Sequence, residues 1–317
     1  MSPVGWIVTP GEAGFESQGR GLAEALGLEP VFKRVRARYP WQRLPGWLWL
    51  NPLGVLAPTS DRLDPPWPDV VISCGKIAAP LGAALRRASG KRVKAVHIQN
   101  PLMPARHFDA VVAPRHDAVR GENVLSTIGA VHPVTPAKLQ AAAPRWAPVF
   151  AELPRPLVGV LIGGSNGRFT LNPSTMVDFA ARLAALAKQH GAGLAITPSR
   201  RTGKDNEAVL AKALAGLPAF VWDGQGENPY LGILGLADIL VVTEDSVSMT
   251  SEALATGKPV YVVRLPGDSA RLRRFQDDLI AEGYTRPFTG ALERWSYTVP
   301  NDTERAAAMC RQRFGWK

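Results

Sequence analysis

Residues 157–167 read LVGVLIGGSNG, six mostly apolar positions followed at once by a glycine-rich turn. The run has no alternating polar positions, which is typical of a strand buried on both faces of a parallel sheet. A helical stretch follows at residues 174–190, so the segment predicts a strand–turn–helix unit. Strands of this kind, each followed by a helix, are the building blocks of doubly wound α/β domains.

The same unit recurs on both sides of this stretch. Downstream, predicted helices alternate with strands expected at 193–197, near 220, at 238–243 and at 259–263. Upstream, the predicted strands are 5–9, 31–35, 69–73, 93–98 and 109–113. Segment 133–156 separates the two series and carries six prolines. Because proline at this density cannot sit inside a sheet, we interpret the segment as a linker with one set of helical turns.

We therefore predict an α/β protein with two Rossmann-like, doubly wound parallel-sheet domains that face a cleft. The expected bounds are residues 1–145 for the N-terminal domain and 146–300 for the C-terminal domain. The helical tail at 301–317 is expected to pack back on the N-terminal domain.

Charge and composition narrow the class of protein. The net charge is +10, and residues 1–155 hold 19 Lys and Arg against 11 Asp and Glu. Residues 156–317 hold 18 against 16, so the first half carries most of the excess and is expected to face an anionic partner. Two cysteines are too few for a disulfide framework, and no apolar run is long enough for a membrane span. We expect a cytoplasmic location, with a peripheral position on the inner face of the membrane as the alternative.

The turns after the strands of the second series carry the candidate ligand-binding residues. In open α/β sheets, ligands bind beyond the carboxyl ends of the strands. Glycine N–H groups and a helix start suit an anion, and paired arginines suit phosphate. A carboxylate one to two turns into the helix suits ribose hydroxyls. The predicted residues are Gly163, Gly164, Ser165, Asn166, Ser199, Arg200, Arg201, Thr202, Glu244, Asp245, Ser246, Ser248, Met249 and Glu252. Tight turns, a solvated basic loop and ordinary helix capping are the alternative explanations.

These turns resemble the donor half of GT-B glycosyltransferases, and the chain as a whole resembles the elongated-mitochondria family of plant mitochondrial-fission factors and their bacterial relatives. The resemblance spans most of the chain. Two positions depart from it, because Phe15 stands where histidine is usual and Ser17 where asparagine is usual. The matching segments are 11–18, 97–101, 162–166, 197–202, 227–230 and 243–249.

The resemblance implies a GT-B-like fold that holds a nucleotide sugar, in which Glu227 and Asn228 also face the donor. Ordinary helix capping is the alternative for this pair. The activity it implies is metal-independent sugar transfer to a cell-envelope or lipid-linked acceptor, with the nucleotide sugar as co-substrate and no further cofactor. The alternative function is a non-catalytic, membrane-associated GT-B-like adaptor.

Sugar transfer needs a base that takes the proton of the acceptor. The candidates are Glu16, Glu12 and His97, all in the first half of the chain. A first-turn carboxylate that favours the helix dipole is the alternative for Glu16, and a buried histidine with a satisfied hydrogen bond is the alternative for His97. No metal site is expected, because the five histidines are scattered and no Asp-x-Asp occurs.

The segment Lys33 to Leu56 combines five basic residues with three tryptophans and several leucines. This composition suits an anionic bilayer surface, a groove for a lipid-linked acceptor, or a protein interface. A loop packed on its own domain is the remaining explanation. Nucleic acid is an unlikely partner, because no recognition motif is present.

Overall fold

The structure is a computed structural model of the 317-residue chain and describes residues 2–316. The chain forms two compact units, unit 1 from the residues up to Pro133 with those from Asn301 onward, and unit 2 from Val134–Pro300. Within the described residues, none of the helices combines the length and the apolar character needed to cross a bilayer.

Unit 1 is built on a six-stranded sheet in the order β2-β1-β3-β4-β5-β6, in which every neighbouring pair is parallel. The strands are β1 Val4–Thr9, β2 Glu29–Arg34, β3 Val70–Cys74, β4 Lys94–Ile98, β5 Ala110–Pro114 and β6 Val124–Thr127. The strand order reverses between β1 and β3. The turns after these two strands therefore lie at a topological switch point, where such sheets bind ligands.

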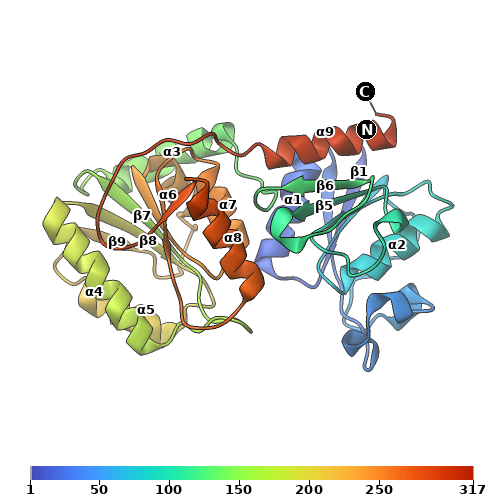
Figure 1. Ribbon diagram of the computed structural model, residues 1–317, viewed down its shortest axis with the longest axis horizontal. Coiled ribbons are helices and arrows are strands. Elements are labelled where there is room, and N and C mark those ends of the chain that lie inside the picture. The colour runs from blue at the N-terminus through green and yellow to red at the C-terminus, as the bar shows by residue number, and fades with distance from the viewer. Residues whose placement is uncertain (1, 317) are drawn as a thin grey trace. The chain divides into compact units, whose positions relative to one another are not determined.

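Helices cover both faces of this sheet (Figure 1). The α-helices of unit 1 are α1 Ala13–Ala25, α2 Ala78–Ala88 and α9 Asp302–Phe314. One apolar core joins Leu22 of α1 and Cys310 of α9 to Ile72 of the sheet. The other joins Leu81 of α2 and Trp49 of a short-helix segment to Val71. The single-turn 3₁₀-helices are η1 Trp41–Arg43, η2 Gly46–Leu48, η3 Pro52–Val55, η4 Ala105–His107 and η5 Arg115–Asp117.

Unit 2 is built on a second parallel sheet, in the order β12-β11-β10-β7-β8-β9. Counted within the unit, this is the 3-2-1-4-5-6 order of a Rossmann fold, and it reverses between β7 and β10. The strands are β7 Leu157–Ile162, β8 Gly193–Pro198, β9 Ala219–Val221, β10 Ile239–Thr243, β11 Val260–Val263 and β12 Thr285–Pro287. The fold-class prediction of two Rossmann-like parallel sheets is confirmed.

The helices of unit 2 again lie on both faces of the sheet (Figure 1). They are α3 Pro136–Phe150, α4 Pro173–His190, α5 Lys204–Ala213, α6 Tyr230–Leu236, α7 Val247–Leu254 and α8 Ala270–Ala281. The side chains of Phe179 and Leu210, from α4 and α5, share a buried core with Val160 of β7. On the other face α6 packs directly on β7, where a Cβ on Gly159 would lie 2.6 Å from Ile233.

The proline-rich segment, which we interpreted as a linker with one set of helical turns, is helical over most of its length. It forms α3, and the boundary between the units lies at Pro133 rather than at 145/146. Thr135 caps the helix by accepting the N–H of Lys138 over 3.3 Å, and proline at the first helical position is well tolerated. Trp146 packs against Gly232 of α6, where a Cβ on the glycine would lie 2.3 Å from the indole ring. Tertiary packing therefore outweighs the cost of two prolines inside the helix.

Candidate functional site

Three loops at the carboxyl edge of the second sheet are tied together at Gly163. Its N–H donates to Thr243 Oγ1 over 2.8 Å. Its carbonyl oxygen accepts from Ser199 Oγ at 2.5 Å and from Thr202 Oγ1 at 2.7 Å. The loops after β7, β8 and β10 therefore meet at one point, where the strand order reverses.

Asp245 holds this junction together from below the surface. Its carboxylate has no exposed area and accepts from Thr243 Oγ1 at 2.6 Å, from the Gly164 N–H at 3.2 Å and from Arg201 Nη2 at 2.8 Å. Burial raises the pKa of the Asp245 carboxyl, while the Thr243 hydroxyl and the Arg201 charge oppose that rise. The carboxylate thus fixes one arginine at the rim of the loop cluster.

The two glycines of the first turn are required by this close packing. A Cβ on Gly163 would lie 2.2 Å from Asp245 Oδ2. Gly164 has a φ of +151°, and a Cβ there would lie 2.1 Å from the carbonyl oxygen of Arg201. We expected their N–H groups to face an anion, but both already donate, to Thr243 and to Asp245. The glycines therefore let the loops approach each other, and an anion must find its donors elsewhere.

The start of α7 and the arginine loop supply such donors. Ser246 caps α7 by accepting the N–H of Met249 over 3.2 Å, and the first turn of a helix offers N–H groups that lack intrahelical partners. Ser248, in that first turn, is buried. On the loop after β8, Arg200 is exposed and Arg201 keeps 41% of its side chain exposed. This combination of helix start and guanidinium groups suits a phosphate.

Glu252 and the segment before α6 are joined by a residue that the sequence analysis did not single out. Tyr230 Oη donates to Glu252 Oε2, and burial raises the pKa of Tyr230 well above its usual value. Asn228 Oδ1 accepts the N–H of Tyr230 at 2.9 Å, and Glu227 pairs with Arg145 at 2.5 Å. Tyr230 thus joins segment 227–230 to α7. The only sequence signal for this residue is its place in a segment that resembles the family.

Glu244 serves the fold rather than the rim of the site. Its side chain is fully buried, accepts from Arg264 Nη1 at 2.9 Å and accepts the N–H of Leu265 at 2.6 Å. These bonds tie the end of β10 to the turn after β11. This geometry favours a structural role for Glu244, and its ligand role stays a prediction.

Ser165 and Asn166 also shape their own loop. Ser165 Oγ accepts the N–H of Leu171 at 2.9 Å, and Asn166 Oδ1 accepts the N–H groups of Arg168 and Phe169 at 2.8 and 3.0 Å. Local side-chain bonds of this kind are characteristic of asparagine and serine in turns. They hold the ten-residue connection between β7 and α4 in one conformation.

In unit 1, the two predicted carboxylates lie at the start of α1. Glu16 is mostly buried and pairs with Arg34 Nε at 2.6 Å, while Glu12 is exposed at the N-cap position and forms no side-chain cap. The Arg34 pair anchors the first turn of α1 to the end of β2. If Glu16 acts as the base, the proton of the acceptor must therefore compete with Arg34 for the Glu16 carboxylate.

His97 is poorly suited to act as a base. It lies fully buried in β4, with Nδ1 2.9 Å from Ser73 Oγ and its ring against Phe108. Burial lowers the pKa of His97 to about 3, so the ring is neutral at physiological pH. A side chain without exposed area is not positioned to reach a ligand, so the geometry favours the alternative of a buried histidine with a satisfied hydrogen bond.

A polar cluster that composition did not reveal lies beyond β4. Gln99 has a φ of +78° and donates from Nε2 to Gln18 Oε1 at 3.3 Å. The Asn100 N–H donates to the buried Asp117 Oδ2 at 3.2 Å. Gln99 and Asn100 stand in one of the family-like motifs, and their position after a strand is the signal that could have selected them.

Among residues 2–316, no group of three or more His, Cys, Asp or Glu side chains is arranged to hold a metal ion. Positive charge at the loop cluster comes from arginine instead.

Solved structures share this architecture. The UDP-GlcNAc 2-epimerase of Methanocaldococcus jannaschii superposes with a TM-score of 0.56 and 13% sequence identity over 98% of each chain. The glycotransferase of kitacinnamycin matches with a TM-score of 0.52 and 14% identity, over 99% of this chain and 94% of that chain. At such low identity these likenesses establish the fold, which is GT-B-like.

Sequence relatives give the family. The mitochondrial fission protein ELM1 of Arabidopsis thaliana is 35% identical over 78% of this chain and 65% of the plant protein. The chain thus spans slightly less than two thirds of the plant protein's length. The family model of mitochondrial fission ELM1 matches residues 13–314, which is nearly the whole chain. The chain therefore belongs to the mitochondrial fission ELM1 family.

Proposed function

We propose that this protein binds a nucleotide sugar at the carboxyl edge of the sheet of unit 2. The observation that carries the proposal is the junction of three loops at the switch point, where Asp245 holds Arg201 at the rim. The similar fold of a UDP-GlcNAc 2-epimerase and of a glycotransferase supports a donor of the UDP-sugar type.

Different residues of the junction bind different parts of the ligand. The diphosphate lies at the start of α7 and against Arg200, because Thr243 and Asp245 occupy the two glycine N–H groups and the Asp245 carboxylate would repel an anion placed there. Glu252 accepts a hydrogen bond from a ribose hydroxyl as well as the one from Tyr230, since a carboxylate has about four acceptor sites. No cofactor besides the nucleotide-sugar co-substrate is proposed.

The proposed reaction is metal-independent transfer of the sugar to a cell-envelope or lipid-linked acceptor. The acceptor oxygen forms a bond to the anomeric carbon as the bond from that carbon to the diphosphate breaks. The nucleoside diphosphate leaves, stabilised by Arg200 and the start of α7, and the acceptor proton passes to Glu16. A lipid-linked acceptor would place the reaction at the inner face of the cytoplasmic membrane.

A non-catalytic adaptor that keeps the nucleotide site is the second candidate. Two observations favour it: Glu16 is already paired with Arg34, and His97 is buried and neutral. The fission protein from Arabidopsis, named for a cellular process rather than for a reaction, is also compatible with it.

The binding step is tested by thermal shift with UDP, UDP-GlcNAc, CMP and GDP. A ligand at about 100 times its dissociation constant stabilises the native state by about 2.7 kcal/mol, so a shift is readily seen. We expect UDP-GlcNAc to raise the melting temperature of the wild type.

Three variants assign the shift to the site. Arg200→Ala and Glu252→Gln should abolish it. Lys212→Ala should keep it, because Lys212 is an exposed charge in the last turn of α5, at the opposite edge of the sheet. The binding proposal fails if none of these nucleotides shifts the wild type, or if Arg200→Ala responds as the wild type does.

A further inference from the structure

Exposed apolar side chains gather on one segment of unit 1. The described residues include eight large hydrophobic side chains that are exposed, and four of them lie between residues 39 and 50. They are Tyr39 (71% exposed), Trp47 (62%), Leu48 (39%) and Leu50 (90%). Single exposed hydrophobic residues are ordinary, but a group of this kind indicates an interaction surface.

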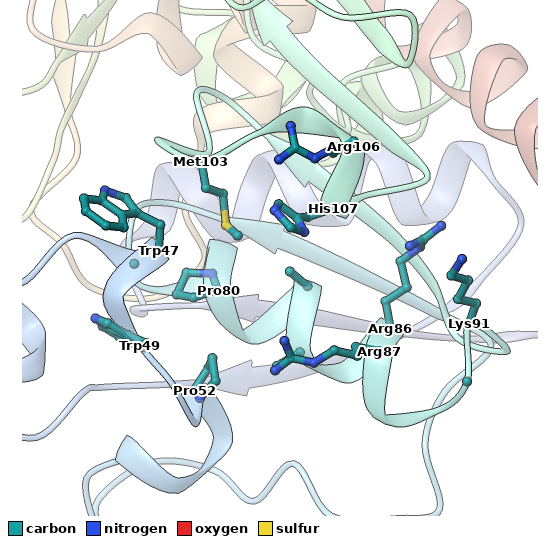
Figure 2. A pocket seen from close by; sticks show the side chains of 14 residues that line it. Trp47, Trp49, Pro52, Pro80, Arg86, Arg87, Lys91, Met103, Arg106 and His107 are labelled. Carbon is teal, nitrogen blue, oxygen red and sulfur yellow. The ribbon is translucent and has the colours of Figure 1, made fainter.

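A pocket of about 460 Å³ opens beside this segment. Figure 2 shows Trp47, Trp49 and Pro52 on one side of it and basic side chains from α2 and η4 on the other. None of the residues that line the pocket is acidic. The pocket therefore has an apolar wall and a cationic wall.

The charge of the cationic wall is mostly uncompensated. Arg86 is neutralised by Asp109, to which it donates two hydrogen bonds of 2.9 Å. In residues 2–316, Arg87, Lys91 and Arg106 form no ion pair. Three positive charges thus remain for an anionic ligand.

The pKa of His107 is sensitive to the positive electrostatic potential of the pocket. It lines the pocket with Arg106 and Arg87 nearby, and Figure 2 shows its ring between Met103 and the arginines of α2. Burial lowers the pKa of His107, and the charges of Arg106, Arg87 and Arg86 lower it further. A bound anion would reverse the effect of these charges.

We propose that this face of unit 1 docks on an anionic lipid bilayer, with Trp47, Leu48 and Leu50 in the interfacial layer and a lipid phosphate held by Arg87, Arg106 and Lys91. Tryptophan favours the headgroup level of a bilayer and leucine the acyl region below it. A nucleic acid would meet the cationic wall but would leave the aliphatic side chains in water. The proposal goes beyond nucleotide binding by unit 2 and does not depend on it.

The test is co-sedimentation of the full chain with vesicles of phosphatidylcholine alone and of phosphatidylcholine mixed with phosphatidylglycerol. We expect binding to the mixed vesicles only, and weaker binding as salt is raised. Arg87→Ala/Arg106→Ala should lower the partition coefficient by roughly thirtyfold, on the basis of two charges near an anionic surface. Trp47→Ser/Leu50→Ser should weaken binding while leaving the UDP-GlcNAc thermal shift unchanged.

Controls match these variants in charge and exposure. Lys188→Ala/Lys212→Ala removes two basic side chains from the last turns of α4 and α5, and Val177→Ser removes an exposed apolar side chain of α4. Both should bind the mixed vesicles as the wild type does.

Several results would overturn the proposal. These are equal binding to neutral vesicles, no binding to either vesicle, or full binding by Arg87→Ala/Arg106→Ala. If inorganic phosphate displaced the protein from vesicles at equal ionic strength, the pocket would be a site for free phosphate and not for a lipid headgroup. Stronger binding to a DNA or RNA oligonucleotide, lost in the same arginine variant, would assign the face to nucleic acid instead.

Discussion

At the switch point of unit 2, Gly163 and Gly164 lie against the Asp245 carboxylate and the Arg201 backbone, whereas at the switch point of unit 1 Gly75 lies against a phenyl ring. Gly75 has a φ of +91°, and a Cβ there would lie 3.0 Å from the ring of Phe15. Both turns use glycine for close approach. The contact in unit 2 is polar and charged, and the contact in unit 1 is apolar.

This difference separates two tasks on closely related folds. Hydrogen bonds are directional and an unpaired buried charge is costly, so the polar junction fixes its loops in one arrangement. An apolar contact is non-directional and accepts other side chains of similar volume. We therefore expect ligand specificity to reside in unit 2.

The largest effect is expected from closing the space at the polar junction. Gly163→Ala places a methyl group 2.2 Å from Asp245 Oδ2, so it should lower the free energy of unfolding by about 3 kcal/mol and remove the nucleotide shift. Urea unfolding followed by circular dichroism measures the change. Gly167→Ala is the matched control in the same loop, because no atom lies within 4 Å of its Cβ position. A similar loss in both variants would show that the junction is not special.

Removing the proposed base should separate binding from chemistry. Glu16→Gln is expected to lower sugar transfer by about a hundredfold or more, while the UDP-GlcNAc thermal shift persists. Transfer of labelled sugar to a membrane extract measures the effect. Glu24→Gln, in the last turn of the same helix, should leave transfer unchanged. Unchanged transfer in Glu16→Gln would reject its role as the base and favour the adaptor.

The buried histidine of unit 1 predicts acid sensitivity. The folded-state pKa of His97 is about 3, against 6.5 in the unfolded chain, so between these values the unfolded state binds the extra proton. Stability should therefore fall as pH drops below about 6.5, by at most about 1.4 kcal/mol from this group over the first pH unit. Urea midpoints across this range should give a shallower slope in His97→Leu. An identical slope would assign the sensitivity to other groups.

The smallest effect is expected at the contact between α6 and α7. Tyr230→Phe removes the donor to the buried Glu252 carboxylate and should cost about 1–2 kcal/mol of stability. The UDP-GlcNAc shift should become smaller without disappearing, because the Glu252 carboxylate, Arg200 and the start of α7 all remain. Tyr39→Phe, at an exposed position, should change neither quantity. A Tyr230→Phe variant with wild-type stability and shift would show that this bond does not support the site.

The local sequence pattern predicted most of the strands, but it did not predict where the two units divide. The apolar runs at 157–162 and 239–243 are strands because unbroken apolar sequence has to be buried on both sides. The full length of helix α3 was not predicted, because its two internal prolines disfavour a helix. Tertiary packing, such as that of Trp146 beside Gly232, offsets that preference. The short strand β12 was also missed, because three residues carry too little pattern.

The candidate site shows the same division. The sequence placed glycines, arginines and hydroxyl side chains after the right strands, since parallel strands bring their carboxyl ends to one edge. It did not say that Asp245 would accept the N–H of Gly164, nor that Tyr230 would bind Glu252. Those contacts join residues 81 and 22 positions apart, and neither partner has a local signal for the other.

By itself, then, the amino-acid sequence determined the strand–turn–helix units, their restart after the proline-rich segment and the family motifs, because each depends on neighbouring residues. The tertiary structure alone decided which polar groups form contacts inside the protein and which remain at its surface. Burial neutralises His97 and places Glu244 against Arg264, whereas Arg87 and Arg106 lie at the surface and form no ion pair with any residue of 2–316.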